Sequence, residues 1–304
     1  MKTLGHILGA AAIMLLALPT IASVASVKVV TTDTTLASIA QEVGGNRVSV
    51  ESLSRATDDP HHVEPTGTMV SKVAHAQVVA RIGMDLDIWL DPILEKAGNA
   101  NVSKSGKGYV DCALNLRVQE MPSAKLDPSM GDIHVYGNPH YLMDPANGIL
   151  AAGNIAAALI RVDPAGQPYY NQRFLDFGAK IKEHLAIWRG MMAPFKGNLL
   201  TTYHRSWVYF VTRFGLKEFG TIEPRPGIQP SQGHVNELIK EMKADKVKAM
   251  LVEEFRSHRF PDLIQQQTGA KAVYVPLSVG ADPAATDYIK LFDVIVGRLA
   301  EAMK

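Results

Sequence analysis

Three histidines stand at positions from which imidazole rings could bind a metal ion. His61 and His140 each follow a proline directly, in DDPHHVEPT and GNPHYLMDP, and His204 ends the segment NLLTTYH. Neutral imidazole is a favoured ligand of zinc, and three such ligands leave one position of a tetrahedral site open. The prolines restrict the backbone and would hold the rings before metal arrives. Each histidine taken singly is more often structural, because loop imidazoles satisfy backbone groups, but the set predicts a metal site.

A further histidine lies in the same stretch as His140. This residue, His134, comes six positions earlier in GDIHVYGNPH. Two interpretations stay open: His134 lines the entrance of the site or hydrogen-bonds one of its ligands, or it is an ordinary loop histidine. His234 is explained by its place at the start of an expected helix. Four more histidines lie in the N-terminal segment or on expected helices: His6, His75, His184 and His258.

Strand-like and helix-like segments alternate along most of the chain. The β-branched run VKVVTTD, residues 27–33, precedes apolar residues at helical spacing that end at Gly44 and Gly45. The same order recurs before residue 167 and again after residue 195. This alternation predicts an α/β fold of mostly parallel sheets flanked by helices. Ligands of such sheets bind outside the carboxyl ends of the strands, which is where His61 and His204 fall.

A long apolar stripe separates two α/β regions. Apolar residues recur every three or four positions across residues 167–195, which predicts one helix of roughly 40 Å. We interpret it as a rigid connector between two lobes, since flexible linkers are rich in Gly, Ser and Pro; a long core helix is the alternative. The predicted boundaries are a signal peptide at 1–25, an N-terminal lobe at 26–166, the connector helix at 167–195 and a C-terminal lobe at 196–304.

The first 25 residues have the pattern of a secretory signal peptide. Lys2 precedes an apolar run from Ile7 to Leu18, and small residues follow. The apolar run is short for a membrane span, so an uncleaved anchor is the weaker alternative. The chain has a single cysteine, Cys112, which leaves no lipid-acceptor cysteine near the cleavage site and no intramolecular disulfide. We therefore expect an exported periplasmic protein that is not lipid-anchored.

The overall charge gives no reason to expect a polyanionic partner. Lys and Arg number 31 against 30 Asp and Glu, a formal net charge of +1. Nucleic acid and an anionic membrane surface are therefore not predicted as partners.

Four motifs in order resemble one known family. DDPHHVEPT, GNPHYLMDPANG, TTYHRSWVYFVTRFGL and EPRPGIQPSQGHVNELI are similar to motifs of the ZnuA/TroA-like metal receptors of bacterial ABC transporters, the cluster A-I solute-binding proteins. The resemblance implies two α/β lobes joined by one rigid helix, with metal held between them by His61, His140 and His204. A histidine at the third position is typical of the family's zinc receptors, whereas manganese receptors tend to carry a carboxylate there. Zn²⁺ is therefore expected, with Mn²⁺ the weaker candidate.

The fourth ligand departs from the family pattern. Relatives place an aspartate at the end of the strand that reads AVYVPLSVG here, but this chain has Val275 and Pro276 at that place. The resemblance suggests Glu253, in MLVEEF, as the substitute, with Glu254, Asp282 or a water molecule as competitors. The long His-rich acidic loop of the family is also missing.

Two functions of different classes follow from this site. The resemblance implies a receptor that delivers Zn²⁺ to a membrane permease and its ATPase, and we expect it to be a monomer and not an enzyme. The alternative is an exported zinc-dependent hydrolase in which Glu253 or Glu254 acts as general base beside a metal-bound water. The sequence contains no His-Glu-x-x-His motif, no serine nucleophile elbow and no Gly-rich phosphate loop. A surface adhesin on the same scaffold is a third possibility.

Overall fold

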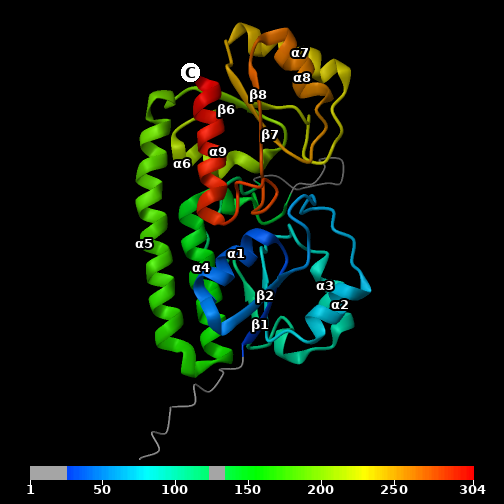
Figure 1. Ribbon diagram of the computed structural model, residues 1–304. Coiled ribbons are helices and arrows are strands. Elements are labelled where there is room, and N and C mark those ends of the chain that lie inside the picture. Colours follow the sequence, from blue (N-terminus) through cyan, green and yellow to red (C-terminus); the bar gives the residue numbers. More distant parts are fainter. Residues whose placement is uncertain (1–25, 123–133) are drawn as a thin grey trace, which may run out of the picture.

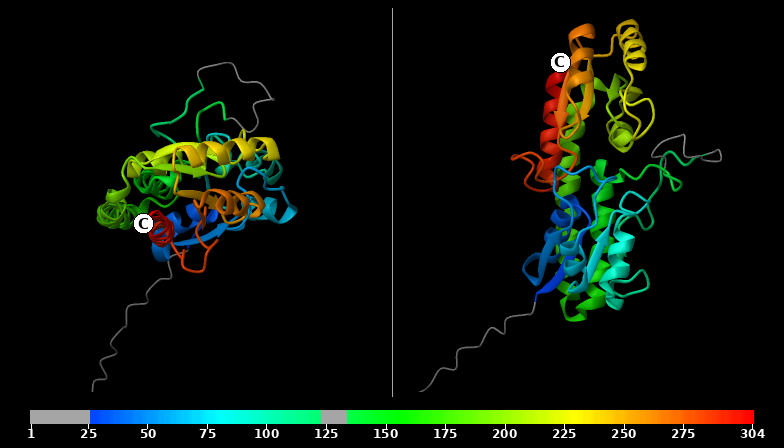
Figure 2. Two further views of the ribbon diagram at one scale, coloured as in Figure 1. Left: turned by 90° about the horizontal axis from the view of Figure 1, so that it is seen from above. Right: turned by 90° about the vertical axis from the view of Figure 1, so that its right-hand side faces the viewer.

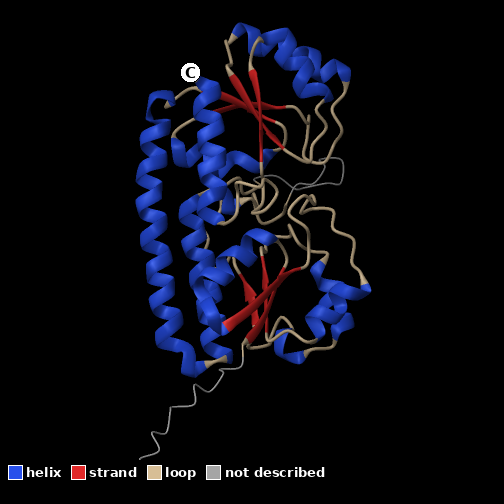
Figure 3. Cartoon of the chain, in the orientation of Figure 1, coloured by secondary structure: helices blue, strands red, loops and turns tan. Residues whose placement is uncertain are grey.

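The computed structural model describes residues 26–122 and 134–304. The predicted signal peptide lies outside the described residues, and its assignment stays a prediction. The chain forms two lobes, which lie one above the other in Figure 1. Each lobe contains one parallel sheet with helices on both faces (Figure 3). The predicted fold class is therefore confirmed.

The N-terminal lobe is built on a four-stranded parallel sheet. Its elements are β1 (Val27–Thr31), α1 (Thr34–Gly44), β2 (Val48–Ser52), α2 (Gly67–Ala74), β3 (Val78–Arg81), α3 (Leu90–Ala97), β4 (Tyr109–Asp111) and α4 (Pro145–Val162). The strands lie in the order β2-β1-β3-β4. Neighbouring β1 residues point to opposite faces, so Val29 joins the core beneath α1 and α4 and Val30 joins the core beneath α2 and α3. Both faces of the sheet are thus buried.

The C-terminal lobe repeats this architecture. Its elements are β5 (Leu199–Thr202), α6 (Val208–Phe214), β6 (Lys217–Thr221), α7 (Gln232–Ala244), β7 (Ala249–Glu253), α8 (Arg259–Thr268), β8 (Lys271–Val275) and α9 (Tyr288–Met303). The strand order is β6-β5-β7-β8, which matches that of the first lobe. Met250 and Val252 face the core shared with α7 and α8, while Leu251 faces the opposite core. The continuous apolar run of β7 is therefore explained by burial on both faces.

One long helix runs along both lobes, as predicted. Helix α5 (Gln167–Met192) has 26 residues, about 39 Å at the usual rise. Figures 1 and 2 show it on one side of the molecule, beside α4 of the first lobe and α9 of the second. Its buried side chains include Phe177, Ile181, Leu185 and Trp188, spaced by three or four residues. A short 3-10 turn at Ala193–Phe195 completes the predicted connector.

The lobes also meet through the segment before α9. Between β8 and α9 the chain returns to the first lobe, where Val279 N donates to Thr35 Oγ1 at 3.3 Å. The Tyr288 hydroxyl then donates to the Leu142 carbonyl at 2.7 Å. One hydrophobic core continues from the first lobe through α5 to α9. Val279 and Tyr288 fall within the predicted C-terminal lobe, residues 196–304, yet they contact the first lobe and help to hold the two lobes together.

Among the described residues, α4 is the one helix whose length and apolar composition would allow it to cross a membrane. Its residues Ala151, Ala152, Ile155 and Leu159 are fully buried in the core of the N-terminal lobe. This packing accounts for the apolar composition of α4.

Two elements of the first lobe were not predicted. Helix α3 and strand β4 have eight and three residues and lie in a stretch for which we predicted no element. Helix α3 begins without a side-chain cap at Trp89. Elements this short show too few periods of their pattern to be recognised.

Candidate metal centre

The loop after β2 positions His61. Asp59 Oδ1 accepts a hydrogen bond from the His61 backbone N–H and lies 2.8 Å from the ring Nδ1. The indole Nε1 of Trp89 donates to the Pro60 carbonyl at 3.0 Å and fixes the backbone beside the histidine. If Asp59 accepts the proton of Nδ1, Nε2 is left as the nitrogen that can bind metal. The His61 side chain is only 6% exposed.

The loop between β4 and α4 positions His140. The side-chain Oδ1 of Asn138 accepts from His140 N at 3.0 Å, and the Asn138 Nδ2 donates to the Arg205 carbonyl at 2.8 Å. Asn138 therefore ties the His140 loop to the residue that follows His204 in the other lobe. Beyond His140, Asp144 caps α4 by accepting from Ala146 N, and Pro145 is the first residue of the helix.

The end of β5 positions His204. Its ring Nδ1 lies 2.7 Å from Glu223 Oε2, and both side chains are 4% exposed. Glu223 follows the neighbouring strand β6, so two adjacent strand ends supply the ring and the group that orients it. Here too the carboxylate favours a proton on Nδ1 and leaves Nε2 for a ligand.

The three histidines meet between the lobes. One nitrogen from each of His61, His140 and His204 lies within 4.8 Å of the others. Their ring centroids are 5.0, 5.1 and 5.3 Å apart. His140 Nε2 is buried and has no hydrogen-bond partner among the described residues. Burial, followed by the neighbouring His61 and His204, lowers the pKa of His140 well below 6.5, so this ring stays neutral and able to bind a cation.

Arg256 joins the carboxylates that hold two of these rings. Its Nη1 lies 3.3 Å from Asp59 Oδ2 and 3.2 Å from Glu223 Oε1. Because Asp59 belongs to the first lobe and Arg256 to the second, the guanidinium bridges the lobes. Burial alone would raise the pKa of Asp59, but the hydrogen bond to His61 and the charges of His61 and Arg256 hold it well below its ordinary value.

The carboxylates considered for the fourth position lie outside the group of three histidines. Glu253 is fully buried at the end of β7, where its Oε1 accepts from Trp207 Nε1 at 2.9 Å. Glu253 does not belong to the group formed by the three histidines. Glu254 and Asp282 both pair with Arg298. The geometry therefore brings together the three predicted histidines but not the predicted glutamate.

Comparison with known proteins identifies the family. A family model described as zinc-uptake complex component A, periplasmic (ZnuA), matches residues 29–302. The chain belongs to the ZnuA family. It is therefore a metal-binding component of the type that serves ABC metal transporters.

Relatives within this family are named for different metals. Iron-binding protein YfeA of Yersinia pestis is 26% identical over 282 residues, which cover 90% of this chain and 85% of YfeA. The high-affinity zinc uptake protein ZnuA of Bacillus subtilis is 23% identical over 246 residues, 80% of this chain and 76% of that protein. The manganese ABC transporter lipoprotein PsaA of Streptococcus pneumoniae is 24% identical over 235 residues, 74% of this chain and 71% of PsaA.

A solved structure supports the fold. The crystal structure of ZnuA superposes with a TM-score of 0.77 at 20% sequence identity, covering 92% of this chain and 100% of that one. The likeness shows that the two-lobed architecture is that of the ZnuA family.

Several residues of this ZnuA-family site escaped sequence reasoning. Asp59, Glu223 and Arg256 hold the histidines, and Asn138 links two of the histidine loops. The sequence could have indicated two of them: Asp59 directly precedes the Pro-His pair, and Glu223 follows the end of a strand. No sequence pattern indicated Arg256, because its partners Asp59 and Glu223 lie far away in the sequence.

One small cavity adjoins the ZnuA-family site in the described part of the chain. A cavity of about 30 Å³ lies next to His140, lined also by Pro60, Pro139 and Leu277. This volume admits one or two water molecules. An organic substrate would not fit there.

Proposed function

We propose that this protein is the exported receptor of an ABC uptake system that captures Zn²⁺ between its lobes. The receptor would hand the ion to a membrane permease driven by an ATPase. The observation that carries this proposal is the buried group of His61, His140 and His204, whose ligand atoms lie within 4.8 Å of one another. Membership of the ZnuA family supports the transport role.

The ligand chemistry supports zinc as the cargo. Imidazole suits zinc, whereas manganese prefers carboxylate, carbonyl and water oxygens. All three members of the group are histidines, and Glu253 lies outside it. The metals named for relatives include iron, zinc and manganese, so the residues of the site, not the family, support the choice.

The buried site supports a receptor over an enzyme. His140 and His204 are 6% and 3% exposed, and the cavity beside His140, about 30 Å³, is large enough only for water. The carboxylates proposed as general base, Glu253 and Glu254, are bonded to Trp207 and Arg298. We propose further that the receptor is a periplasmic monomer whose residues 1–25 are removed on export.

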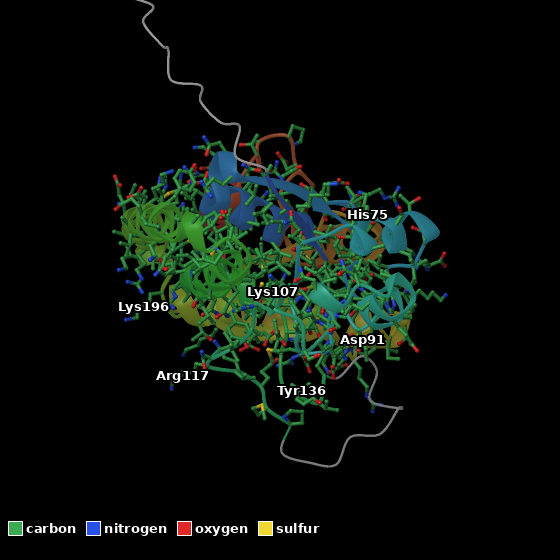
Figure 4. The ribbon with its side chains drawn as sticks, turned by 90° about the horizontal axis from the view of Figure 1, so that it is seen from below. His75, Asp91, Lys107, Arg117, Tyr136 and Lys196 are labelled. Carbon is green, nitrogen blue, oxygen red and sulfur yellow. The ribbon has the colours of Figure 1, made fainter. Side chains whose placement is uncertain are left out.

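The test is metal binding by the purified chain and by a variant without the three rings. We expect the wild-type protein to hold one equivalent of Zn²⁺ and to prefer it to Mn²⁺ in competitive titration. The triple variant His61→Ala, His140→Ala, His204→Ala should retain none. Variant His75→Ala is the matched control, because His75 is exposed at the end of α2 and lies at the outer edge of the molecule in Figure 4.

Two outcomes would contradict the proposal. Full zinc affinity in the triple variant would mean that the ion binds elsewhere. A preference of the wild-type protein for Mn²⁺ would exclude zinc as the cargo chosen by this site.

A further inference from the structure

We propose that His134 supplies the fourth protein ligand of the metal, so that the site holds its ion with four imidazoles. This inference rests on the proposed function. The chain has Val275 and Pro276 where the motif resemblance leads us to expect an aspartate. Another donor must therefore come from elsewhere, or water must fill the position.

The ring of His134 lies beside His61 at the spacing expected of two ligands of one ion. Its centroid is 5.4 Å from that of His61, compared with 5.0 to 5.3 Å among the three histidines. A zinc–nitrogen bond of about 2.0–2.1 Å puts each ring centroid about 3.2 Å from the ion, so tetrahedral ligands have centroids about 5.2 Å apart. The His61–His134 spacing differs little from this value.

His134 also has a nitrogen to offer. Its Nε2 is buried and makes no hydrogen bond with the part of the chain that the structure describes, as is true of His140 Nε2. A buried polar atom without a partner costs free energy, which a bound cation would recover. His134 lies outside the group within 4.8 Å, so it has to move toward His140 and His204 when the ion binds.

A tight turn brings His134 back toward His140. Gly137 N donates to the His134 carbonyl at 3.2 Å, and Gly137 has φ of 94°, a conformation that favours glycine. A Cβ at this position would lie 2.3 Å from Val118 Cγ1. Tyr136, inside the same turn, is 58% exposed and points away from the body of the molecule in Figure 4. The turn thus directs His134 inward while its tip stays in solvent.

The competing carboxylates are less available. Glu253 Oε1 is held by Trp207, and Glu254 and Asp282 share Arg298. Recruiting Glu254 or Asp282 would break an ion pair with Arg298, whereas Nε2 of His134 breaks none. Glu253 Oε2 has no hydrogen-bond partner among the described residues, but it lies 3.8 Å from Arg256 Nε, and Glu253 is outside the group of three histidines. Four imidazoles would strengthen the preference for zinc over manganese.

The experiment counts imidazole ligands in the zinc-loaded protein by X-ray absorption at the zinc edge. We expect four in the wild type and three in His134→Ala. In titrations with zinc alone, His134→Ala should lose at least the roughly 10-fold to 100-fold in affinity that changes around a metal site commonly cost. His75→Ala should match the wild type in both measurements.

A second variant tests the identity of the donor rather than its presence. His134→Asp replaces the imidazole by an oxygen ligand, so it should bind more tightly than His134→Ala and shift the ratio of zinc to manganese affinity toward manganese. Circular dichroism of the metal-free variants checks that each is folded.

The failures of the two proposals are distinguishable. Three imidazoles in the wild type, with zinc affinity unchanged in His134→Ala but lost in the triple variant, would overturn the role of His134 alone. Zinc retained by the triple variant would overturn the site itself.

Discussion

At the scale of single residues, the site is a set of imidazole rings, two of which contact charged neighbours. Asp59 and Glu223 each contact the Nδ1 of one histidine, and Arg256 contacts both carboxylates. In the metal-free protein the guanidinium offsets these buried negative charges. When a dication binds, the same positive charge opposes it. Arg256 should therefore stabilise the metal-free form more than the loaded form.

This asymmetry can be measured with Arg256→Met. We expect the metal-free variant to lose up to roughly 3–5 kcal/mol of unfolding free energy, the range for breaking a buried ion pair. The loss should be smaller in the zinc-loaded protein, because the ion replaces the missing positive charge. Urea unfolding with and without zinc measures both values.

The matched control for Arg256 is Arg259→Met. Arg259 is exposed at the start of α8, where its guanidinium lies 4.9 Å from the ring centroid of Phe260. Arg259→Met should lower the unfolding free energy only slightly, and by the same amount in the metal-free and the zinc-loaded protein. Equal destabilisation of the free and loaded forms by Arg256→Met would show that Arg256 only supports packing.

Sequence reasoning found the rings but not what holds them. The Pro-His pairs and the strand-end histidine are local patterns, and the structure brings all three together. The Asp59–Arg256–Glu223 contacts join segments that are about 30 to 200 positions apart, so only the folded chain reveals them. Glu253 was suggested by the family resemblance, but Oε1 of its side chain accepts from Trp207.

At the scale of elements, strand ends and helix starts place the donors. His204 follows β5, His61 follows β2, and the His140 loop is held by the first turn of α4. The start of α4 is also a contact between lobes, since Arg213 of α6 donates to both carboxylate oxygens of Asp144, at 2.7 and 2.5 Å. Asp144 thus has two roles: it caps α4 and it anchors α6 through Arg213.

Substitutions of Asp144 separate these two roles. Asp144→Asn keeps a capping side chain but loses the charge of the pair, and we expect it to cost about 1.5–3 kcal/mol of unfolding free energy. Asp144→Ala should cost about 1 kcal/mol more, because the cap is lost too. Denaturant titration of metal-free protein measures both. Identical values for the two variants would show that the cap contributes nothing.

Patterning predicted most elements because they are long or strongly β-branched. The stripe of α5 and the β-branched run of β1 gave their positions to within a few residues. Helix α3 and strand β4 escaped because their stability comes from contacts made after folding, such as the Arg81–Asp91 pair between β3 and α3. Tertiary contacts of this kind do not produce a hydrophobic periodicity in the local sequence.

At the scale of the whole molecule, two similar sheets are joined by one continuous core. The buried residues of α1, α4, α5 and α9 form a single cluster that extends through both lobes. The boundaries 26–166, 167–195 and 196–304 remain our proposal for the organisation of the chain. The core nevertheless implies that the lobes do not unfold independently.

This implication predicts one cooperative unfolding transition. For the metal-free protein, urea midpoints from far-ultraviolet circular dichroism and from tryptophan fluorescence should coincide. Trp89 lies in the first lobe, Trp188 in α5 and Trp207 in the second lobe, so the fluorescence samples every part. Two separated transitions would mean that the shared core does not couple the lobes.

The shared core has a consequence for recognition by a transporter. Lobes anchored to the same two helices, α5 and α9, have little freedom to swing apart, so empty and loaded receptors would offer nearly the same outline to a permease. Shape would then be a poor signal of occupancy. What changes on loading is the charge at the seam between the lobes, by two positive units, and the order of the side chains around it. A membrane partner would then distinguish a full receptor from an empty one by this local change in charge and side-chain order rather than by outline.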